Sequence, residues 1–277
     1  MRFRKIYVEI SNLCNLSCAF CPGTRRKPGR MRPEDFAELL PKLRPYTDYL
    51  YFHIMGEPLC HPRLQELLHL AGVHGFRVIL TTNGTLLPQQ QQMLLEAPAL
   101  HKINISLHAF EANDLAVPFS VYLDGCFRFG KAAEGKKLVV YRLWNRGGAD
   151  ERNGEILQAM AGYFAQPWVE EVRGTRIGER VFLEYGEKFD WPDLQAPEGS
   201  GKVFCYGLRD QLGVLWDGTV VPCCLDHEGD LALGNLFRQE MEEILQSPRA
   251  KGIYEGFSRK EAAEELCRRC GYATRFG

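Results

Sequence analysis

Three cysteines close together near the start of the chain constrain its fold and chemistry more than any other feature. They follow the spacing Cys14-x3-Cys18-x2-Cys21, and the next cysteine along the chain is Cys60. A closed structural zinc site takes four ligands, usually as two pairs. A four-iron cluster held by three thiolates instead keeps one iron free for another ligand. The spacing therefore favours a cluster with one open iron over a partial zinc site or three buried thiols.

The segment around these cysteines resembles a known family. Residues 6–10, Ile-Tyr-Val-Glu-Ile, are predicted to form a strand, and the cysteine loop follows at once. Its sequence Cys-Asn-Leu-Ser-Cys-Ala-Phe-Cys, with Phe20 before the third cysteine, resembles the cluster loop of radical S-adenosylmethionine (SAM) enzymes. The resemblance implies that Cys14, Cys18 and Cys21 bind a [4Fe–4S] cluster whose open iron is chelated by SAM. It also implies cleavage of SAM to a 5′-deoxyadenosyl radical, which abstracts a substrate hydrogen.

Short apolar runs alternate with helical stretches over the first two thirds of the chain. Strands are expected at residues 6–10, 49–54, 77–82, 102–107 and 137–143, with a sixth at 169–172 or 180–185. Helices are expected at residues 33–43, 63–74, 88–96, 121–134 and 155–164, the last one capped by Asn153. Such repeats predict an α/β fold with a parallel sheet. They fit either a doubly wound sheet or an open barrel, and the resemblance implies a partial (β/α)6 TIM-like barrel over residues 1–185.

A second candidate motif, Met55-Gly56-Glu57-Pro58, follows the second predicted strand. Its backbone carbonyls and carboxylate are groups that could face a cation. It resembles the Gly-Gly-Glu-Pro motif of the family, which holds the SAM amino group, with Met55 in place of the first glycine. The resemblance thus assigns Gly56, Glu57 and Pro58 to SAM binding, a role that Met55 leaves intact if the contact is made by the backbone.

Polar residues end the third, fourth and fifth predicted strands, at the rim where barrel enzymes build their active sites. The resemblance makes Asn83 and Ser106 candidates for the ribose or the methionyl carboxylate of SAM. Arg142 is a candidate for the same carboxylate, because a guanidinium binds a carboxylate through two hydrogen bonds. Asn83 could equally form a turn, and Ser106 could be a buried polar group. Three histidines near the rim could act as acid–base groups, although a histidine at a barrel mouth is more often structural: His53, His61 and His108.

The C-terminal part is predicted to be a second unit. Residues 186–203 are irregular and form a linker or loop, and residues 204–277 begin with a hairpin around Asp217-Gly218. Helices are expected at residues 239–246 and 260–266. Four cysteines of this unit could form a zinc ribbon: Cys205, Cys223, Cys267 and Cys270.

The spacing of these cysteines, with Gly218 five residues before Cys223, looks more like an α+β SPASM domain in its shortened form, called twitch. It is also similar to the spacing in an aminocyclitol-oxidising dehydrogenase of the family. The resemblance implies a second [4Fe–4S] cluster, with Cys224 as the alternative to Cys223. Isolated cysteines are usually small buried hydrophobic residues. This applies to Cys126, whereas Cys60, near the predicted SAM loop, is a weak candidate for a catalytic hydrogen-atom donor.

Composition narrows the class of protein. The 277 residues are 45% hydrophobic with a formal net charge of −1, so no general affinity for nucleic acid or anionic membranes is expected. One basic run, at residues 24–32, is either a solvated loop or a site for an anionic substrate or an acidic electron donor. The sequence contains neither a long apolar run nor a charged leader, so we expect no membrane span and no signal peptide. Ten cysteines then indicate reduced thiols in the cytoplasm.

The expected function is that of a radical SAM oxidoreductase acting on a small polar molecule or a peptide side chain. A two-electron oxidation would follow if the second cluster accepts an electron from the substrate radical. A flavodoxin or ferredoxin is the expected donor. The alternatives are a radical SAM enzyme that modifies a peptide, tRNA or nucleotide by epimerisation or bond formation, and a non-enzymatic iron–sulfur protein for electron transfer or redox sensing.

Overall fold

The middle of the fold is a curved parallel sheet. The computed structural model describes residues 2–113, 117–148, 151–172 and 174–276. Within these ranges the strands form one sheet in the order β11-β10-β9-β1-β2-β3-β4-β5-β8-β7-β6. Six neighbouring strands run parallel: β1 (Lys5–Val8), β2 (Tyr49–Phe52), β3 (Arg77–Thr82), β4 (Leu100–Ser106), β5 (Leu138–Arg146) and β8 (Val181–Glu187).

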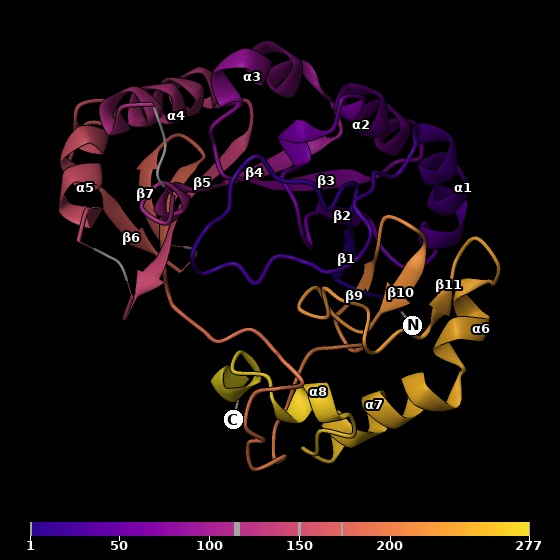
Figure 1. The fold of residues 1–277 in the computed structure, drawn as a ribbon. Coiled ribbons are helices and arrows are strands. Elements are labelled where there is room, and N and C mark those ends of the chain that lie inside the picture. Colours follow the sequence, from indigo (N-terminus) through magenta and orange to yellow (C-terminus); the bar gives the residue numbers. More distant parts are fainter. Residues whose placement is uncertain (1, 114–116, 149–150, 173, 277) are drawn as a thin grey trace.

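The order of these six strands distinguishes between the two folds that the sequence left open. Their order in space follows their order in the chain, whereas a doubly wound sheet reverses direction at a switch point. The helices between them lie along the outer side of the sheet in an arc (Figure 1). They are α1 (Pro33–Leu43), α2 (Leu64–Val73), α3 (Leu87–Glu96), α4 (Phe119–Ala133) and α5 (Asn153–Ala161). The predicted partial (β/α)6 barrel is therefore confirmed.

The first helix illustrates how the sequence builds this layer. Pro33 occupies the first helical turn, where a missing N–H costs nothing, and the acidic side chains of Glu34 and Asp35 face the positive end of the helix dipole. Phe36 and other apolar residues of α1 are fully buried. The Phe36 ring packs edge-on against Phe52 of β2, with centroids 5.6 Å apart. Burying such a face stabilises the helix by roughly 1.5–3 kcal/mol per large apolar side chain.

The structure decides two local predictions for the barrel. The second alternative for the sixth strand, residues 180–185, is confirmed by β8, while β6 (Val169–Glu171) and β7 (Gly174–Gly178) form an antiparallel extension at the edge of the sheet. Asn153 does not cap α5: it is the first residue of the helix, and Arg152 occupies the cap position. The Asn153 amide exchanges hydrogen bonds with Asn145 on β5 instead. A tertiary partner thus replaces the local capping bond.

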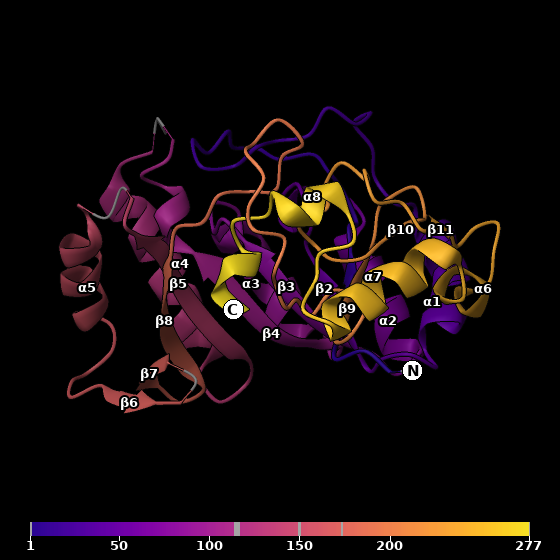
Figure 2. The ribbon, with the colours of Figure 1, turned by 90° about the horizontal axis from the view of Figure 1, so that it is seen from below.

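The C-terminal unit continues the barrel sheet. β9 (Gln211–Val214) pairs in parallel with β1, and it forms the predicted hairpin with β10 (Thr219–Val221), followed by β11 (Gly234–Asn235). The helices α6 (Met241–Leu245), α7 (Pro248–Ser258) and α8 (Glu265–Arg268) lie below the open side of the barrel (Figures 1 and 2). The unit therefore lies against the barrel opening.

One helix prediction in this unit is wrong. A helix was expected at residues 260–266, but α7 ends at Ser258 and the chain becomes helical again only at Glu265. Lys260 has a positive φ of 61°, which ends the helical path. The start of α7 carries a signal that could have revealed it, because Ser247 accepts a hydrogen bond from the N–H of Ala250 and Pro248 occupies the first turn.

Three short 3-10 helices complete the fold. They are η1 (Pro58–Cys60), η2 (Leu107–Ala109) and η3 (Ala273–Phe276). Among the residues that the structure describes, no helix has the length and apolar character needed to cross a membrane.

Candidate functional site

The three N-terminal cysteines lie on the loop between β1 and α1, at the carboxyl ends of the barrel strands. Cys14 and Cys21 are exposed and Cys18 is half-buried. All three line a cavity of about 390 Å³. The walls of this first cavity also include residues from the ends of β2, β3 and β4: Gly56, Glu57, Thr82, Asn83 and Ser106. The structure thus brings together the cysteine loop and most of the residues predicted to bind SAM.

Polar N–H groups surround the sulfur atoms of this loop. The N–H of Leu16 donates to Cys14 Sγ at 3.4 Å, and the side-chain amide of Asn113 donates to Cys18 Sγ at 3.1 Å. Asn113 is held in turn by the N–H of Ser17, 2.9 Å from its Oδ1. Hydrogen bonds to sulfur stabilise thiolates bound to iron and influence the potential of the cluster. No sequence motif indicated Asn113, which approaches from the β4–α4 connection.

Burial makes free thiolates unfavourable here, so a bound cation would compensate. Burial raises the pKa of Cys14 to about 11, and it raises that of Cys18 although Asn113 opposes the shift. Among the described residues no three His, Cys, Asp or Glu side chains converge as ligands of a single metal ion. A tetrahedral zinc site needs sulfurs only about 3.8 Å apart. In a cluster each thiolate binds a different iron, and three thiolates lining one cavity fit a cluster with one open iron.

The Gly-Glu-Pro loop holds the cysteine loop in place. Gly56 has φ +76°, and a Cβ at this position would lie 2.4 Å from the Ser11 carbonyl oxygen. The N–H of Glu57 donates to the carbonyl of Leu13 at 2.9 Å. The Glu57 carboxylate is buried and accepts hydrogen bonds from the N–H of Leu59 (2.9 Å) and of Asn83 (2.7 Å).

These contacts determine which groups of the Gly-Glu-Pro loop are available to a ligand. Burial raises its pKa to about 7, against the effect of the hydrogen bonds that it accepts from the backbone and Thr82. Its side chain connects the ends of β2 and β3, so the backbone of this loop is the part available to a cation in the cavity. Met55 is likewise buried, consistent with a contact that does not depend on its side chain.

Asn83 and Phe20 also have partners within the protein. The Asn83 amide donates to Asn15 Oδ1 at 2.9 Å and accepts from the N–H of Thr85 at 3.0 Å, so Asn83 does form a turn while still lining the first cavity. The Phe20 ring lies 5.1 Å from the ring of His108. Both rings border the first cavity and a second one.

The second cavity has a volume of about 510 Å³ and extends from the barrel interior to the C-terminal unit. Arg142 lines this cavity and not the first, which separates it from the other SAM candidates. The two cavities adjoin, sharing several wall residues: Phe20, His53, Ile54, Thr81, Ser106, His108 and Trp191. Sequence reasoning missed the aromatic walls, including Tyr7, Trp144 and Tyr272. The only available signal was the position of Trp144 two residues after Arg142 on β5.

The other residues singled out from the sequence lie outside both cavities or within the scaffold. Cys60 lines neither cavity, and its backbone N–H donates to the carbonyl of Glu57 at 3.0 Å. His61 Nε2 lies 3.0 Å from the carbonyl oxygen of Met31. Cys126 is fully buried on α4, as expected for an isolated cysteine.

The C-terminal cysteines lie close enough to one another to raise one another's pKa values. Burial raises the pKa of Cys223, and the neighbouring thiols Cys224, Cys205 and Cys267 raise it further. Cys270 likewise raises the pKa of Cys205 and of Cys267, where burial is again the main cause. Four thiols in one place fit a cluster that one thiolate per iron would hold.

The adjacent Cys224 has a different environment. Its side chain lines the second cavity and interacts with the Tyr7 hydroxyl, which lowers the thiol pKa, while burial raises it to about 11 overall. Cys205 raises the pKa of both thiols, and Cys267 raises that of Cys223. Cys223 therefore stays the predicted ligand, with Cys224 as the alternative.

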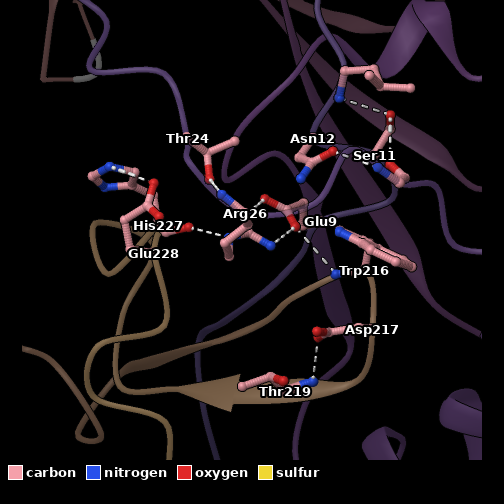
Figure 3. A network of polar contacts seen from close by, with 12 residues as sticks. Glu9, Ser11, Asn12, Thr24, Arg26, Trp216, Asp217, Thr219, His227 and Glu228 are labelled. Atoms are coloured by element: carbon pink, nitrogen blue, oxygen red, sulfur yellow. Dashed lines mark hydrogen bonds and ion pairs between the residues drawn. The ribbon is translucent and has the colours of Figure 1, made fainter.

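The basic run at residues 24–32 contains one half-buried cation, Arg26, among exposed ones. Arg26 forms a buried ion pair with Glu9, at 2.5 and 2.9 Å, and donates to the carbonyl of His227 (Figure 3). Glu9 also accepts from the N–H of Trp216 at 3.2 Å. Arg25 contacts Glu228. Arg25 and Arg26 therefore connect the cysteine loop to the C-terminal unit. The sequence sign of this contact, which was missed, is the acidic Glu9 within the apolar run 6–10.

Comparison with known proteins identifies two regions of the chain. Residues 8–126 match the Radical SAM superfamily, and residues 205–271 match the iron–sulfur cluster-binding domain called SPASM. These matches cover the two groups of cysteines described above.

Curated relatives match over part of their length. A tungsten-containing aldehyde ferredoxin oxidoreductase cofactor-modifying protein of Pyrococcus furiosus is 32% identical over 142 residues, which cover 50% of this chain and 38% of the relative. The S-adenosyl-L-methionine-dependent 2-deoxy-scyllo-inosamine dehydrogenase of Niallia circulans is 28% identical over 114 residues, covering 39% of this chain and 46% of that protein. The chain thus spans less than half the length of these relatives.

Solved structures share the fold over nearly the whole chain. BtrN in complex with AdoMet and 2-DOIA superimposes with a TM-score of 0.63 at 20% identity, covering 98% of this chain and 93% of that one. Streptococcus suis SuiB bound to the precursor peptide SuiA gives a TM-score of 0.65 at 16% identity, covering 97% and 72%. At these identities the likeness concerns the fold alone.

Proposed function

The chain belongs to the radical SAM superfamily and carries a SPASM-type iron–sulfur domain, and from this premise we propose that it oxidises a small polar molecule or a peptide side chain. Bound SAM and its cluster would supply a 5′-deoxyadenosyl radical that removes a hydrogen atom from the substrate. The dehydrogenase among the relatives supports the choice of oxidation.

We assign two clusters and one SAM site to named residues. Cys14, Cys18 and Cys21 would hold the first cluster. Around it, the residues assigned to SAM line the same cavity: Phe20, Gly56, Glu57, Asn83 and Ser106. Pro58 begins the 3-10 helix behind this loop and supports it. The ligands of the second cluster would be Cys205, Cys223, Cys267 and Cys270. This division takes the barrel as residues 1–185 and the cluster domain as residues 204–277, with residues 186–203 as the linker.

One observation carries the proposal: the two cavities adjoin, and each is lined by cysteine from a different unit of the chain. The first contains the three N-terminal cysteines, and the second is bordered by Cys224, next to Cys223. Ser106 and His108 form part of both walls, so a substrate in the second cavity would lie beside the SAM site. A substrate placed there has a cluster on either side, which is the arrangement that an oxidation with an internal electron acceptor requires.

The partners follow from the same chemistry. A one-electron donor of the flavodoxin or ferredoxin type would reduce the first cluster. The ten cysteines are all free thiols in the structure, which fits a reducing cytoplasm. A peptide remains a second substrate class, supported by the structural likeness to SuiB bound to its precursor peptide.

The test is release of 5′-deoxyadenosine. Anaerobically reconstituted protein with SAM and dithionite should release it slowly without substrate, and Cys18→Ala should reduce release to background because two thiolates cannot hold the cluster. Cys126→Ala is the matched control, since Cys126 is buried on α4 away from both cavities. Reducible clusters without any 5′-deoxyadenosine in the wild type would favour an electron-transfer protein and refute the proposed enzyme.

A further inference from the structure

The second cavity contains an arginine whose binding edge is free. Arg142 Nε donates to Glu184 Oε2 at 3.3 Å, and neither of its Nη atoms has a hydrogen bond to a described residue. Its guanidinium lies over the Trp144 indole, 4.4 Å from the ring centroid. The aromatic face fixes the guanidinium plane, and the two Nη atoms remain as a fork that matches a carboxylate or a phosphate.

The charges around this cavity are mostly positive. Four cationic side chains line it, Arg4, Lys5, Arg142 and Lys188, against one carboxylate, Asp210. Asp210 is 3.8 Å from Arg4 at the exposed side of the cavity. Lys5 forms no ion pair with any residue in the described part of the chain, and its ammonium lies 5.9 Å from the centroid of Tyr51. Arg142 is paired with Glu184 at 3.3 Å, so the cations of this cavity without an ion pair among the described residues are Lys5 and Lys188. An anion entering the cavity would therefore meet a net positive charge.

We propose that the substrate of this protein carries a carboxylate or phosphate group, bound by Arg142 with the help of Lys5 in the second cavity. This inference rests on the proposed function, because it names the chemical class of its substrate. It moves the anion site from the basic run, where Arg26 is already paired with Glu9, to the interior of the barrel.

Neighbouring groups support this assignment. Burial lowers the pKa of Arg142, and Glu184, Tyr7 and Tyr272 oppose this shift, so a bound anion would add to the stabilisation of the buried cation that Glu184 provides. Arg142 and Lys5 both lower the pKa of His53, after burial, and so share one region of the cavity. Trp144 Nε1 and His53 Nδ1 are buried without a hydrogen-bond partner among the described residues. A bound polar ligand would supply the hydrogen-bond partners that these two nitrogens lack.

The aromatic wall of the second cavity indicates the rest of the substrate. Aromatic rings from the linker and the C-terminal unit pack against one another there, with Phe189 5.0 Å from Tyr272 and Tyr272 5.5 Å from Phe276. Trp191 continues this wall to the first cavity. A flat or apolar body would lie against these rings, while its anionic group is bound by Arg142.

The inference can be tested with small aromatic probes on reconstituted protein with SAM. Benzoate, phenyl phosphate and the neutral benzamide differ in the group that Arg142 would recognise, and ligand-observed NMR titration reports their affinities. We expect at least one of the anions to bind and benzamide to bind at least tenfold more weakly. Arg142→Gln should weaken the anion about ten- to a hundredfold, since a charged hydrogen bond is lost. The anion affinity of Arg142→Lys should lie between that of the wild type and that of Arg142→Gln.

Arg146→Gln is the matched control. Arg146 lies on the same strand and also covers an aromatic ring, with Tyr185 at 4.3 Å, but it does not line the cavity. It should bind the probes like the wild type. A preference for benzoate indicates a carboxylate substrate, and a preference for phenyl phosphate indicates a phosphate, and either supports the inference.

Other outcomes would overturn it. Equal affinity for benzamide and both anions would do so, as would equal losses in the Arg142→Gln and Arg146→Gln variants. If Arg142→Gln loses affinity for SAM while benzoate binding is unchanged, Arg142 binds SAM and not the substrate. If the wild type binds the anions but never cleaves SAM, the anion site stands and only the proposed enzymatic function fails.

Discussion

The carboxylate of Glu9 and the guanidinium of Arg26 form a two-point ion pair between the end of the first barrel strand and the cysteine loop. The side chain of Glu9 is fully buried and that of Arg26 is 14% exposed. Burial raises the pKa of Glu9, and Arg26 opposes that shift. Because Arg26 also donates to the carbonyl of His227, one side chain connects strand, loop and C-terminal unit (Figure 3).

Breaking this pair should destabilise the fold strongly. Arg26→Gln leaves the Glu9 carboxylate buried without its cation, and we expect a loss of about 3–5 kcal/mol in the free energy of unfolding. Arg32→Gln in the same basic run removes an exposed pair with Asp35 and should cost far less stability. Urea denaturation of both variants measures the difference. Similar losses would show that the buried pair has no special weight.

A second prediction concerns the contact between the Gly-Glu-Pro loop and the cysteine loop. Gly56→Ala places a Cβ 2.4 Å from the Ser11 carbonyl oxygen, so the loops must separate and SAM affinity should fall at least tenfold. Gly147→Ala is the control, since Gly147 has a similar φ of +78° and open space around it, and it does not line the first cavity. That change should cost only the backbone strain of about 1–2 kcal/mol. Isothermal titration with SAM compares the two, and equal effects would count against the contact.

The third prediction distinguishes the adjacent cysteines of the C-terminal unit. Cys223→Ala removes a thiolate that faces Cys205 and Cys267, so reconstituted protein should lose the second cluster, falling from about eight to about four irons per chain. Cys224→Ala changes a thiol that faces Tyr7 and should keep about eight. Iron and sulfide analysis with EPR spectroscopy checks this. The reverse pattern would make Cys224 the ligand.

The fourth prediction concerns pH. Burial lowers the pKa of His108 to about 4, opposed by its contact with the Arg142 carbonyl. An unfolded histidine binds a proton below about pH 6.5. Because the folded state binds its proton only at lower pH, stability is lost as pH falls from about 6.5 towards 4.

Between pH 7.5 and 5.5 this histidine should cost about 1 kcal/mol of unfolding free energy. His108→Gln keeps an acceptor for the Trp144 N–H and removes the titration. The variant should therefore lose about 1 kcal/mol less than the wild type over this interval, as measured by urea unfolding at both pH values. Identical losses would mean that His108 does not contribute.

Much of the fold was predictable because its signals are local. The strand expected at residues 77–82 is β3, and the helix expected at residues 33–43 is α1, with the same bounds. Side-chain periodicity and the proline and acids at a helix start act within a few residues. The missed helix α7 had such a signal at Ser247, and the wrong cap at Asn153 failed because Asn145 lies across from it in the fold.

The sequence by itself determined the chemistry that the chain can support. The spacing of Cys14, Cys18 and Cys21 is fixed by the covalent chain over a few residues, and it does not depend on how the rest of the protein folds. The sequence also determined the period of strands and helices, and hence the class of fold. Only the tertiary structure decided which cavity contains Arg142, that Glu9 is the partner of Arg26, and that β9 extends the barrel beside β1. These relationships join residues far apart in the chain, and they depend on how the strand ends converge when the sheet curves, which no local pattern encodes.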